Sequence, residues 1–119
     1  MSRGSALLAL VLTSCVTPAK FGSELDRLTC EREYECAQGA FDALYGDVGE
    51  CRAELDEATG DLFQCELASC TFDTTAARQC LHDLRTAPCD EIVDGSAAMR
   101  CDEVFVDCDM TALYACAGA

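Results

Sequence analysis

The sequence has few basic residues, no tryptophan and a single histidine. In the 119-residue chain, 8 Lys and Arg residues stand against 22 Asp and Glu residues, which gives a formal net charge of −14. Because clustered Lys and Arg bind the phosphate backbone, this balance argues against binding nucleic acid. A chain of this length without tryptophan also excludes a large enzyme with a deep apolar cleft.

Catalytic motifs are also missing from the sequence. It contains no G-x-S-x-G, H-E-x-x-H, P-loop or G-x-G-x-x-G pattern. The one histidine, His82, follows Cys80-Leu81 and precedes Asp83. This setting is typical of the polar side of a helix, so we expect a solvated surface histidine. We predict no catalytic residue, no cofactor and no enzyme activity.

The cysteines and carboxylates lack metal-site spacing. The only close cysteine pair, Cys65-x₄-Cys70, has neither a second pair nor suitably spaced histidines, as a structural zinc site requires. The acidic residues also lack the glycine and glutamate positions of an EF-hand loop. We predict no metal site and a solvated acidic face that includes Glu31, Glu33, Glu35, Asp102, Glu103, Asp107 and Asp109.

Residues 1–14 are typical of a bacterial export signal. Arg3 provides a positive charge, and residues 6–12 are an apolar segment too short to span a bilayer. The following Leu12-Thr13-Ser14-Cys15 resembles a lipobox, the site at which signal peptidase II cleaves before cysteine. The resemblance implies that Cys15 becomes the first mature residue and carries acyl chains. Two or more such chains anchor a protein firmly in a membrane.

The residues after Cys15 indicate the destination of the chain. Val16 follows the cysteine where an aspartate would retain many lipoproteins in the inner membrane. The lipobox resemblance therefore implies an outer-membrane anchor, on either the periplasmic or the outer face. The alternative is an ordinary signal cleaved after Ala19, which would release a secreted protein. We expect residues 15–23 to form a lipidated N-terminus and a short tether spanning under about 30 Å.

The remaining ten of the eleven cysteines indicate a disulfide-rich domain. Their even number allows up to five disulfides in an oxidising compartment, and the spacing leaves the connectivity open. From Leu25 onward, only 23 residues are Leu, Ile, Val, Met, Phe or Tyr. We expect so thin a core to depend on disulfides, with these candidates: Cys30, Cys36, Cys51, Cys65, Cys70, Cys80, Cys89, Cys101, Cys108 and Cys116.

Residues 24–119 show helical periodicity and predict one all-α domain of four to five short helices. A capping box at Ser23–Asp26 predicts the start of the first helix, whose apolar stripe continues to Leu44. Tyr45-Gly46-Asp47 predicts a turn. The second helix is expected to start at this turn, and Gly60 predicts that it bends or ends there.

The second half of the domain continues this pattern. Asp73 is expected to cap a third helix that Pro88 stops. After a turn at Asp94-Gly95, a fourth helix is expected from Ser96, with Phe105 and Cys108 on its apolar face. A last helix covers roughly residues 111–116. Alternating β-branched or aromatic residues are nearly absent, so no strand is predicted.

Four groups of residues between positions 36 and 105 have a distinctive spacing. They are Cys36…Phe41…Tyr45-Gly46…Cys51 with Leu55, Cys70-Thr71-Phe72-Asp73, Ala76-Ala77-Arg78-Gln79-Cys80-Leu81 with Cys89, and Cys101-Asp102-Glu103-Val104-Phe105. These motifs resemble those of cysteine-rich envelope lipoproteins of myxobacterial type. That resemblance supports the fold and the location and implies no activity.

These observations lead to one expected function and one alternative. We expect a lipid-anchored, non-enzymatic envelope module that is structural or binds a partner, such as another envelope protein or a surface polymer. The acidic charge favours basic partners. The alternative is a secreted or anchored small inhibitor of a hydrolase, because disulfide-stabilised small domains often present rigid inhibitory loops.

Overall fold

A computed structural model describes residues 16–118 of the chain. The described part is a small, disulfide-rich helical domain, which confirms the expected fold class. Its elements are α2 (Pro18–Cys36), α3 (Gln38–Leu44), α4 (Val48–Ser69), β1 (Thr71–Phe72), α5 (Thr74–Thr86), α6 (Cys89–Asp94), the 3₁₀-helix η1 (Ser96–Glu103), β2 (Phe105–Val106) and α7 (Met110–Ala117).

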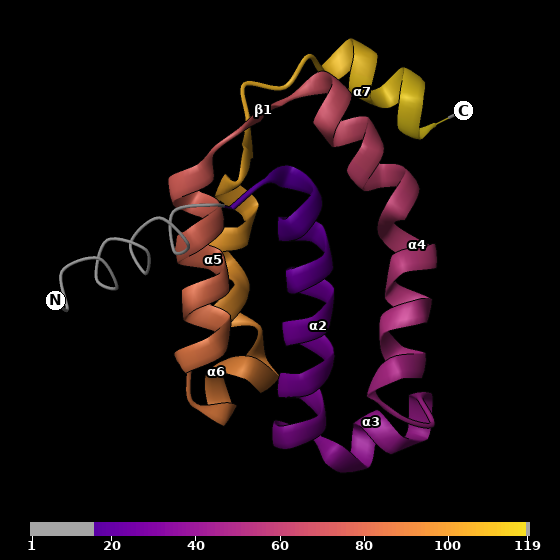
Figure 1. Ribbon diagram of the computed structural model, residues 1–119, viewed down its shortest axis with the longest axis vertical. Helices are drawn as coiled ribbons and strands as arrows, with labels where there is room; N and C mark the ends of the chain where they lie inside the picture. The colour runs from indigo at the N-terminus through magenta and orange to yellow at the C-terminus, as the bar shows by residue number, and fades with distance from the viewer. Residues whose placement is uncertain (1–15, 119) are drawn as a thin grey trace, which may run out of the picture.

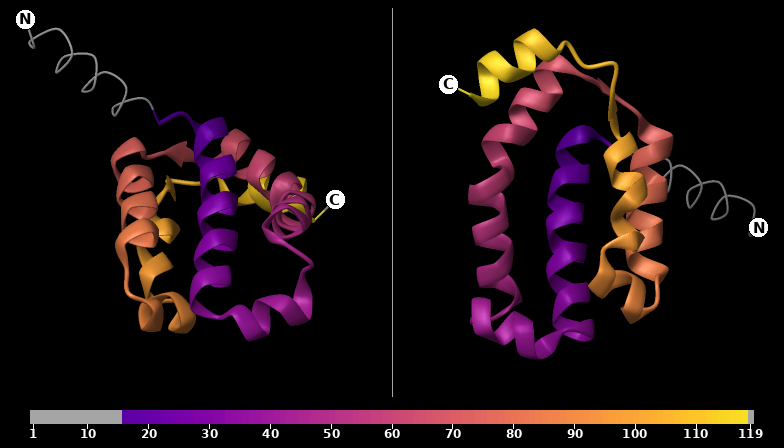
Figure 2. Two further views of the ribbon diagram at one scale, coloured as in Figure 1. Left: turned by 60° about the horizontal axis from the view of Figure 1, so that its bottom comes forward. Right: turned by 180° about the vertical axis from the view of Figure 1, so that it is seen from behind.

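The long helix α2 lies in the middle of the molecule. Helix α4 runs along one side of it, and α5 with η1 runs along the other (Figure 1), an arrangement that Figure 2 shows from two further directions. Helix α3 connects α2 to α4 at one end of the molecule. At the opposite end, β1 carries the chain back from α4 to α5, and α7 lies against α4.

Helix α2 begins earlier than predicted. The Thr17 hydroxyl accepts a hydrogen bond from the Lys20 N–H at 3.3 Å, and Pro18 occupies the first helical turn. The helix therefore does not start at the predicted capping box of Ser23, which is wrong. The predicted tether is wrong for residues 18–23, because these residues are helical. The reason is tertiary: the helical start places Phe21 in the core, where it is only 2% exposed.

The predicted first helix is divided in two. Ala37 leaves the helical conformation, with φ −140° and ψ 50°, and α3 starts at the next residue. The change of direction allows Phe41 to pack against the Cys30–Cys51 disulfide. The predicted turn before α4 is confirmed, because Asp47 Oδ1 accepts from the Glu50 N–H at 2.8 Å.

Helix α4 does not end at Gly60, because it runs without interruption for 22 residues to Ser69. Its two halves point in different directions (Figure 1), so of the two predicted outcomes, a bend or an end, the bend is the one that fits. An interior glycine costs a helix about 1 kcal/mol relative to alanine, which a long hydrogen-bonded helix tolerates. Burial of Cys51 and Cys65 holds the two halves of α4 in place. Leu62, between these two cysteines, is 48% exposed.

The start of α5 confirms the prediction, whereas the segment after it differs. Asp73 Oδ1 accepts from the Ala76 N–H at 3.0 Å, and α5 ends just before Pro88. The short helix α6 was not predicted. Gly95, with φ 85°, makes the predicted turn, but the next helix is a 3₁₀-helix that ends at Glu103.

Strand β2 replaces the end of the predicted fourth helix. Strands β1 and β2 pair antiparallel, with Phe72 opposite Phe105. Each strand has only two residues, so neither produces the alternating pattern by which a strand is recognised. The pairing depends on contact between chain segments more than 30 residues apart, beside the Cys70–Cys108 disulfide.

The domain has two separate clusters of buried side chains. The larger lies between α2, α5 and η1 and includes Phe21, Leu28, Leu81 and Val104. The smaller lies where α2, α3 and α4 meet, around Phe41. Among residues 16–118, no helix has the length and apolar character needed to cross a bilayer.

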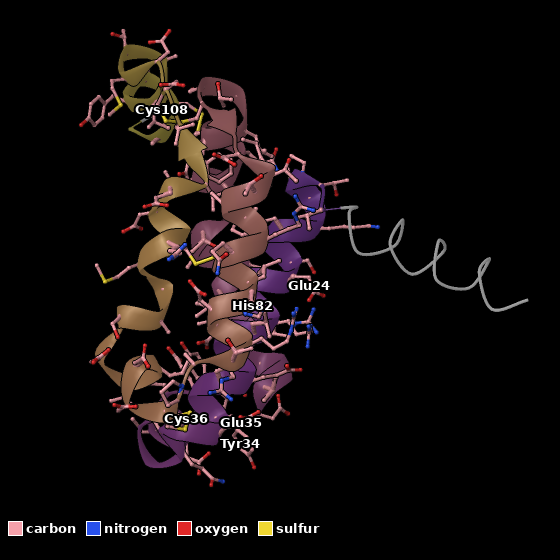
Figure 3. All side chains as sticks on the ribbon, turned by 90° about the vertical axis from the view of Figure 1, so that its left-hand side faces the viewer. Glu24, Tyr34, Glu35, Cys36, His82 and Cys108 are labelled. Atoms are coloured by element: carbon pink, nitrogen blue, oxygen red, sulfur yellow. A yellow bond between two sulfur atoms is a disulfide. The ribbon has the colours of Figure 1, made fainter. Side chains whose placement is uncertain are left out.

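All ten cysteines of the described part form disulfides. These bonds connect α2 to α4, α2 to α6, α5 to η1, and the C-terminal end of α4 to the last segment of the chain. Cys36 and Cys108 lie near opposite ends of the molecule (Figure 3), so the disulfides span its full length. The pairs are Cys30–Cys51, Cys36–Cys89, Cys65–Cys116, Cys70–Cys108 and Cys80–Cys101.

Candidate binding cleft between α2 and α4

The residues singled out from the sequence do not meet at one place. The predicted lipidation residue Cys15 and the predicted signal peptide lie outside the described residues. His82 is exposed on α5 (Figure 3). The ten cysteines of residues 16–118 are paired in disulfides and are not available as ligands or nucleophiles.

Several of the predicted acidic residues have local partners. The Arg27 guanidinium binds Glu24 and Glu31, at 2.6 and 2.8 Å, and the hydrogen bond from Arg27 lowers the pKa of Glu24. Asp109 caps α7 by accepting from the Ala112 N–H at 3.1 Å. In the part of the chain that the structure describes, no three His, Cys, Asp or Glu residues form a group able to hold a metal ion.

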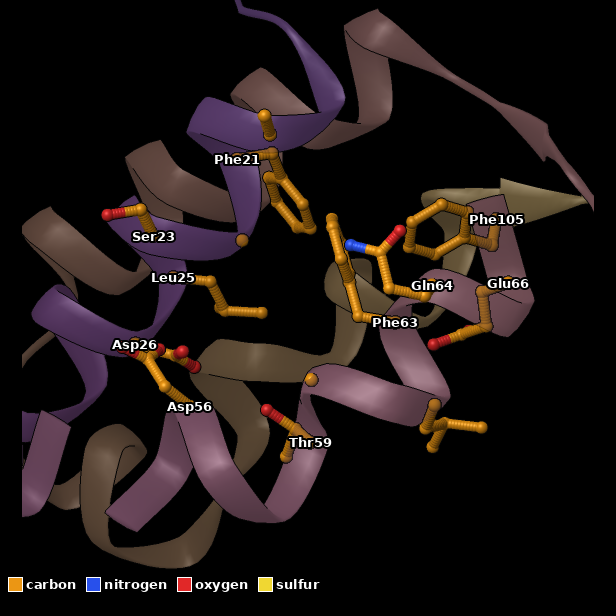
Figure 4. Close-up of a pocket in the computed structure, with 14 residues that line it drawn as sticks. Phe21, Ser23, Leu25, Asp26, Asp56, Thr59, Phe63, Gln64, Glu66 and Phe105 are labelled. Carbon is orange, nitrogen blue, oxygen red and sulfur yellow. The ribbon is translucent and has the colours of Figure 1, made fainter. Parts of the chain in front are cut away.

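A cleft of about 480 Å³ opens between the N-terminal half of α2 and the C-terminal half of α4. We call it the α2–α4 cleft. Phe21 and Leu25 of α2 and Phe63 of α4 project into the space between the two helices, and Phe105 of β2 lies at one end (Figure 4). Its volume is within the range of small-molecule binding sites, about 300–1,000 Å³.

Two glycines help to shape the cleft. A Cβ atom at Gly22 would lie 3.1 Å from Cζ of Phe63, so Gly22 allows the Phe63 ring to approach the α2 backbone. A Cβ atom at Gly60 would meet nothing within 4 Å, so the α4 backbone faces open space there. The described disulfides join α2 to α4 only through Cys30–Cys51, in the other half of α2.

Four aromatic rings form a continuous row at one end of the cleft. Phe21 contacts Phe72, Phe72 contacts Phe105, and Phe105 contacts Phe63, with ring centroids 5.7, 5.7 and 5.6 Å apart. All three contacts are edge-to-face, the arrangement favoured by aromatic quadrupoles. Phe63, Phe72 and Phe105 also pack against the larger core cluster. The apolar wall is therefore continuous with the rigid core.

Carboxyl groups lie at both ends of the apolar wall. Asp26 and Asp56 approach each other from α2 and α4, and Glu66 lies near Phe105 (Figure 4). Burial, a hydrogen bond to Asp56 and repulsion by its charge raise the pKa of Asp26 to about 7, against a smaller opposite effect of Arg52. Burial also raises the pKa of Glu66.

All charged side chains in the lining of the cleft are acidic. Of the 14 residues that line the cleft, three are carboxylic acids and none is Lys, Arg or His. The Thr59 hydroxyl in the lining donates to the Leu55 carbonyl at 2.7 Å, so its proton is directed along its own helix. The arrangement suits reversible binding of a molecule with an apolar body and a positive charge.

The sequence analysis did not identify this cleft. Asp26 and Asp56 are 30 positions apart, Asp26 belongs to the predicted capping box, and Asp56 lies in no motif. Their apposition depends on how α2 and α4 pair, which the sequence pattern does not reveal. Comparison with protein-family models, curated proteins and solved structures finds no match to the chain.

Proposed function

We propose that the chain is an exported, lipid-anchored binding module of the bacterial envelope, without enzyme activity of its own. One observation carries the proposal: ten cysteines pair with one another in disulfides, and the eleventh, Cys15, directly follows an apolar export segment. Disulfides persist in oxidising compartments outside the cytoplasm, which supports export. In this proposal Cys15, which lies in a lipobox-like sequence, is the acylation site.

The position of Cys15 relative to the fold supports this assignment. Helix α2 starts at Pro18, only three residues after Cys15. An acyl anchor at Cys15 would therefore hold the domain close to the outer-membrane surface. A rigid acidic module at that position would contact an envelope protein or a surface polymer with basic groups. The α2–α4 cleft supplies a separate apolar surface for recognition.

The test compares the full-length chain with its Cys15→Ser variant in a Gram-negative host. We expect the unaltered protein to partition with outer membranes and to have a mass that starts at residue 15 with acyl groups added. The Cys15→Ser protein should lack the acyl mass and leave the membrane fraction or remain an uncleaved precursor. Alkylation without reduction should modify no cysteine of either protein outside position 15.

A matched control is the Ser14→Ala variant, which keeps a small residue before the cysteine and should mature normally. An unlipidated protein that starts after Ala19 would contradict the anchor and support a secreted protein instead. Several alkylated cysteines in the native protein would contradict the disulfide argument.

A further inference from the structure

We infer that the α2–α4 cleft binds a small amphiphilic cation, in which an apolar chain or ring carries one ammonium group. The inference names the ligand class of the binding module proposed above, and so rests on that function but not on the lipid anchor. It is carried by the juxtaposition of an aromatic-walled cavity, an apposed carboxyl pair and a lining without any basic side chain.

The apolar wall determines where the body of the ligand lies. Phe21, Leu25 and Phe63 face the cavity, and Phe105 closes one end (Figure 4). Removing an apolar chain from water against these side chains provides the non-specific part of the affinity. A cation close to such ring faces gains a further electrostatic attraction.

The carboxyl pair determines the charge of the ligand. Asp26 and Asp56 face each other across the cleft, and Arg52 of α4 is the basic residue whose field opposes their negative charge. An anionic ligand would face three acidic side chains and no basic one in this lining. A neutral ligand would cover these groups without compensating their charge. Only a cation satisfies both parts of the site.

Binding should release a proton. Below about pH 7 the Asp26 carboxyl carries a proton, since its pKa is about 7. A bound ammonium group favours the ionised Asp26 carboxylate and expels that proton. The affinity for a cation should therefore rise between about pH 6 and pH 8, whereas the affinity for a neutral molecule should stay unchanged.

The probes are octyltrimethylammonium, 1-octanol and octanoate, three ligands of equal chain length and different charge, used below micelle-forming concentrations. They are added to the oxidised Cys15→Ser protein in the absence of detergent. Amide chemical shifts of the cleft residues give the dissociation constants. We expect octyltrimethylammonium to bind about tenfold more tightly than 1-octanol, and octanoate not to bind.

Two sets of variants test the site. The Asp26→Asn/Asp56→Asn protein should lose the preference for the cation and keep its affinity for octanol. The matched control, Asp42→Asn/Asp102→Asn, removes two carboxyl groups from exposed positions outside the cleft and should bind like the parent. Gly60→Leu fills open space in the cleft and should weaken both ligands, whereas Gly39→Leu fills open space on α3 and should weaken neither.

Equal binding of the cation and octanol would overturn the inference and leave an apolar site without charge selectivity. Tighter binding of octanoate would also overturn it and indicate a fatty-acid site. Absence of binding by all three probes would exclude a small-molecule ligand of this class. None of these results changes the Cys15 test, so an anchored module without the proposed ligand remains distinguishable from a ligand-binding protein without the anchor.

Discussion

Asp26 is the residue whose chemistry depends most on its neighbours. In an unfolded chain its carboxyl group has a pKa near 3.8, whereas in the fold burial and Asp56 raise the pKa to about 7. Between these two pH values the folded protein holds a proton that the unfolded chain has released. The free energy of unfolding therefore falls as the pH rises from about 4 to about 7.

Replacing Asp26 with Asn should remove this pH dependence. The amide keeps a hydrogen-bond donor toward Asp56 but carries no charge. At pH 8 we expect the Asp26→Asn protein to be more stable by on the order of 1–2 kcal/mol, after allowance for solvent screening of this pair, in which Asp26 is partly buried and Asp56 is exposed. At pH 4 the two proteins should be equally stable. Guanidinium unfolding of the oxidised proteins, followed by circular dichroism, provides the measurement.

The exposed Asp42 supplies the control for this comparison. An Asp42→Asn change removes one charge on α3 and should alter the stability little at either pH. An equal gain at pH 4 and pH 8 for Asp26→Asn would mean that the charge of Asp26 is not the cause.

At the scale of the elements, the disulfides differ in whether they join elements of the core or attach a peripheral helix. Cys80–Cys101 joins α5 to η1 inside the larger core cluster, and Cys80 is fully buried. Cys65–Cys116 joins α4 to α7, a terminal helix that has no buried residue. The paired cysteines are 21 positions apart in Cys80–Cys101 and 51 positions apart in Cys65–Cys116. If only the entropy of loop closure mattered, Cys65–Cys116 would be the more stabilising disulfide.

We expect the opposite order. Cys80→Ala/Cys101→Ala should lower the free energy of unfolding by about 3–5 kcal/mol, because it also leaves a cavity in the core. Cys65→Ala/Cys116→Ala should cost under about 2 kcal/mol, since α7 can separate while the core remains folded. Guanidinium unfolding of both proteins measures the difference. A larger loss for Cys65→Ala/Cys116→Ala would show that loop entropy in the unfolded chain dominates.

The elements also show how a local pattern is overridden. Ser23–Asp26 has the form of a capping box but lies inside α2, because Thr17 and Pro18 provide an earlier start. Moving the start to Pro18 buries Phe21, and burying such a side chain contributes about 1.5–3 kcal/mol, more than one cap. The break at Ala37 similarly serves tertiary packing, since it directs Phe41 toward the Cys30–Cys51 disulfide.

At the scale of the whole molecule, two small core clusters are joined by a network of covalent bonds. Only twelve described hydrophobic residues, four of them cysteines, are buried. Most of the stability of protein helices such as α2 and α4 comes from tertiary packing rather than from intrinsic helix propensity. The stability of the domain should therefore depend on its disulfides.

Reduction should unfold the domain. In excess phosphine reductant we expect loss of most helical circular dichroism at 222 nm and of the cooperative thermal transition. Each native disulfide of a small domain contributes about 2–5 kcal/mol, so five exceed the usual net stability of about 5–15 kcal/mol. The control is oxidised protein incubated with the oxidised form of the reagent. A cooperative transition that survives complete reduction would contradict this account.

The sequence by itself determined the helical class, the disulfide-rich character, the turn before α4, the cap at Asp73, and the end of α5 at Pro88. Each depends on neighbouring residues or on simple counts, which a linear pattern records. Tertiary structure alone decided the disulfide connectivity, the start of α2, the β1–β2 pair and the α2–α4 cleft. These features depend on contacts between residues about 20 to 55 positions apart, such as Asp26 with Asp56 and Phe21 with Phe72, whose energies act only after the helices have packed.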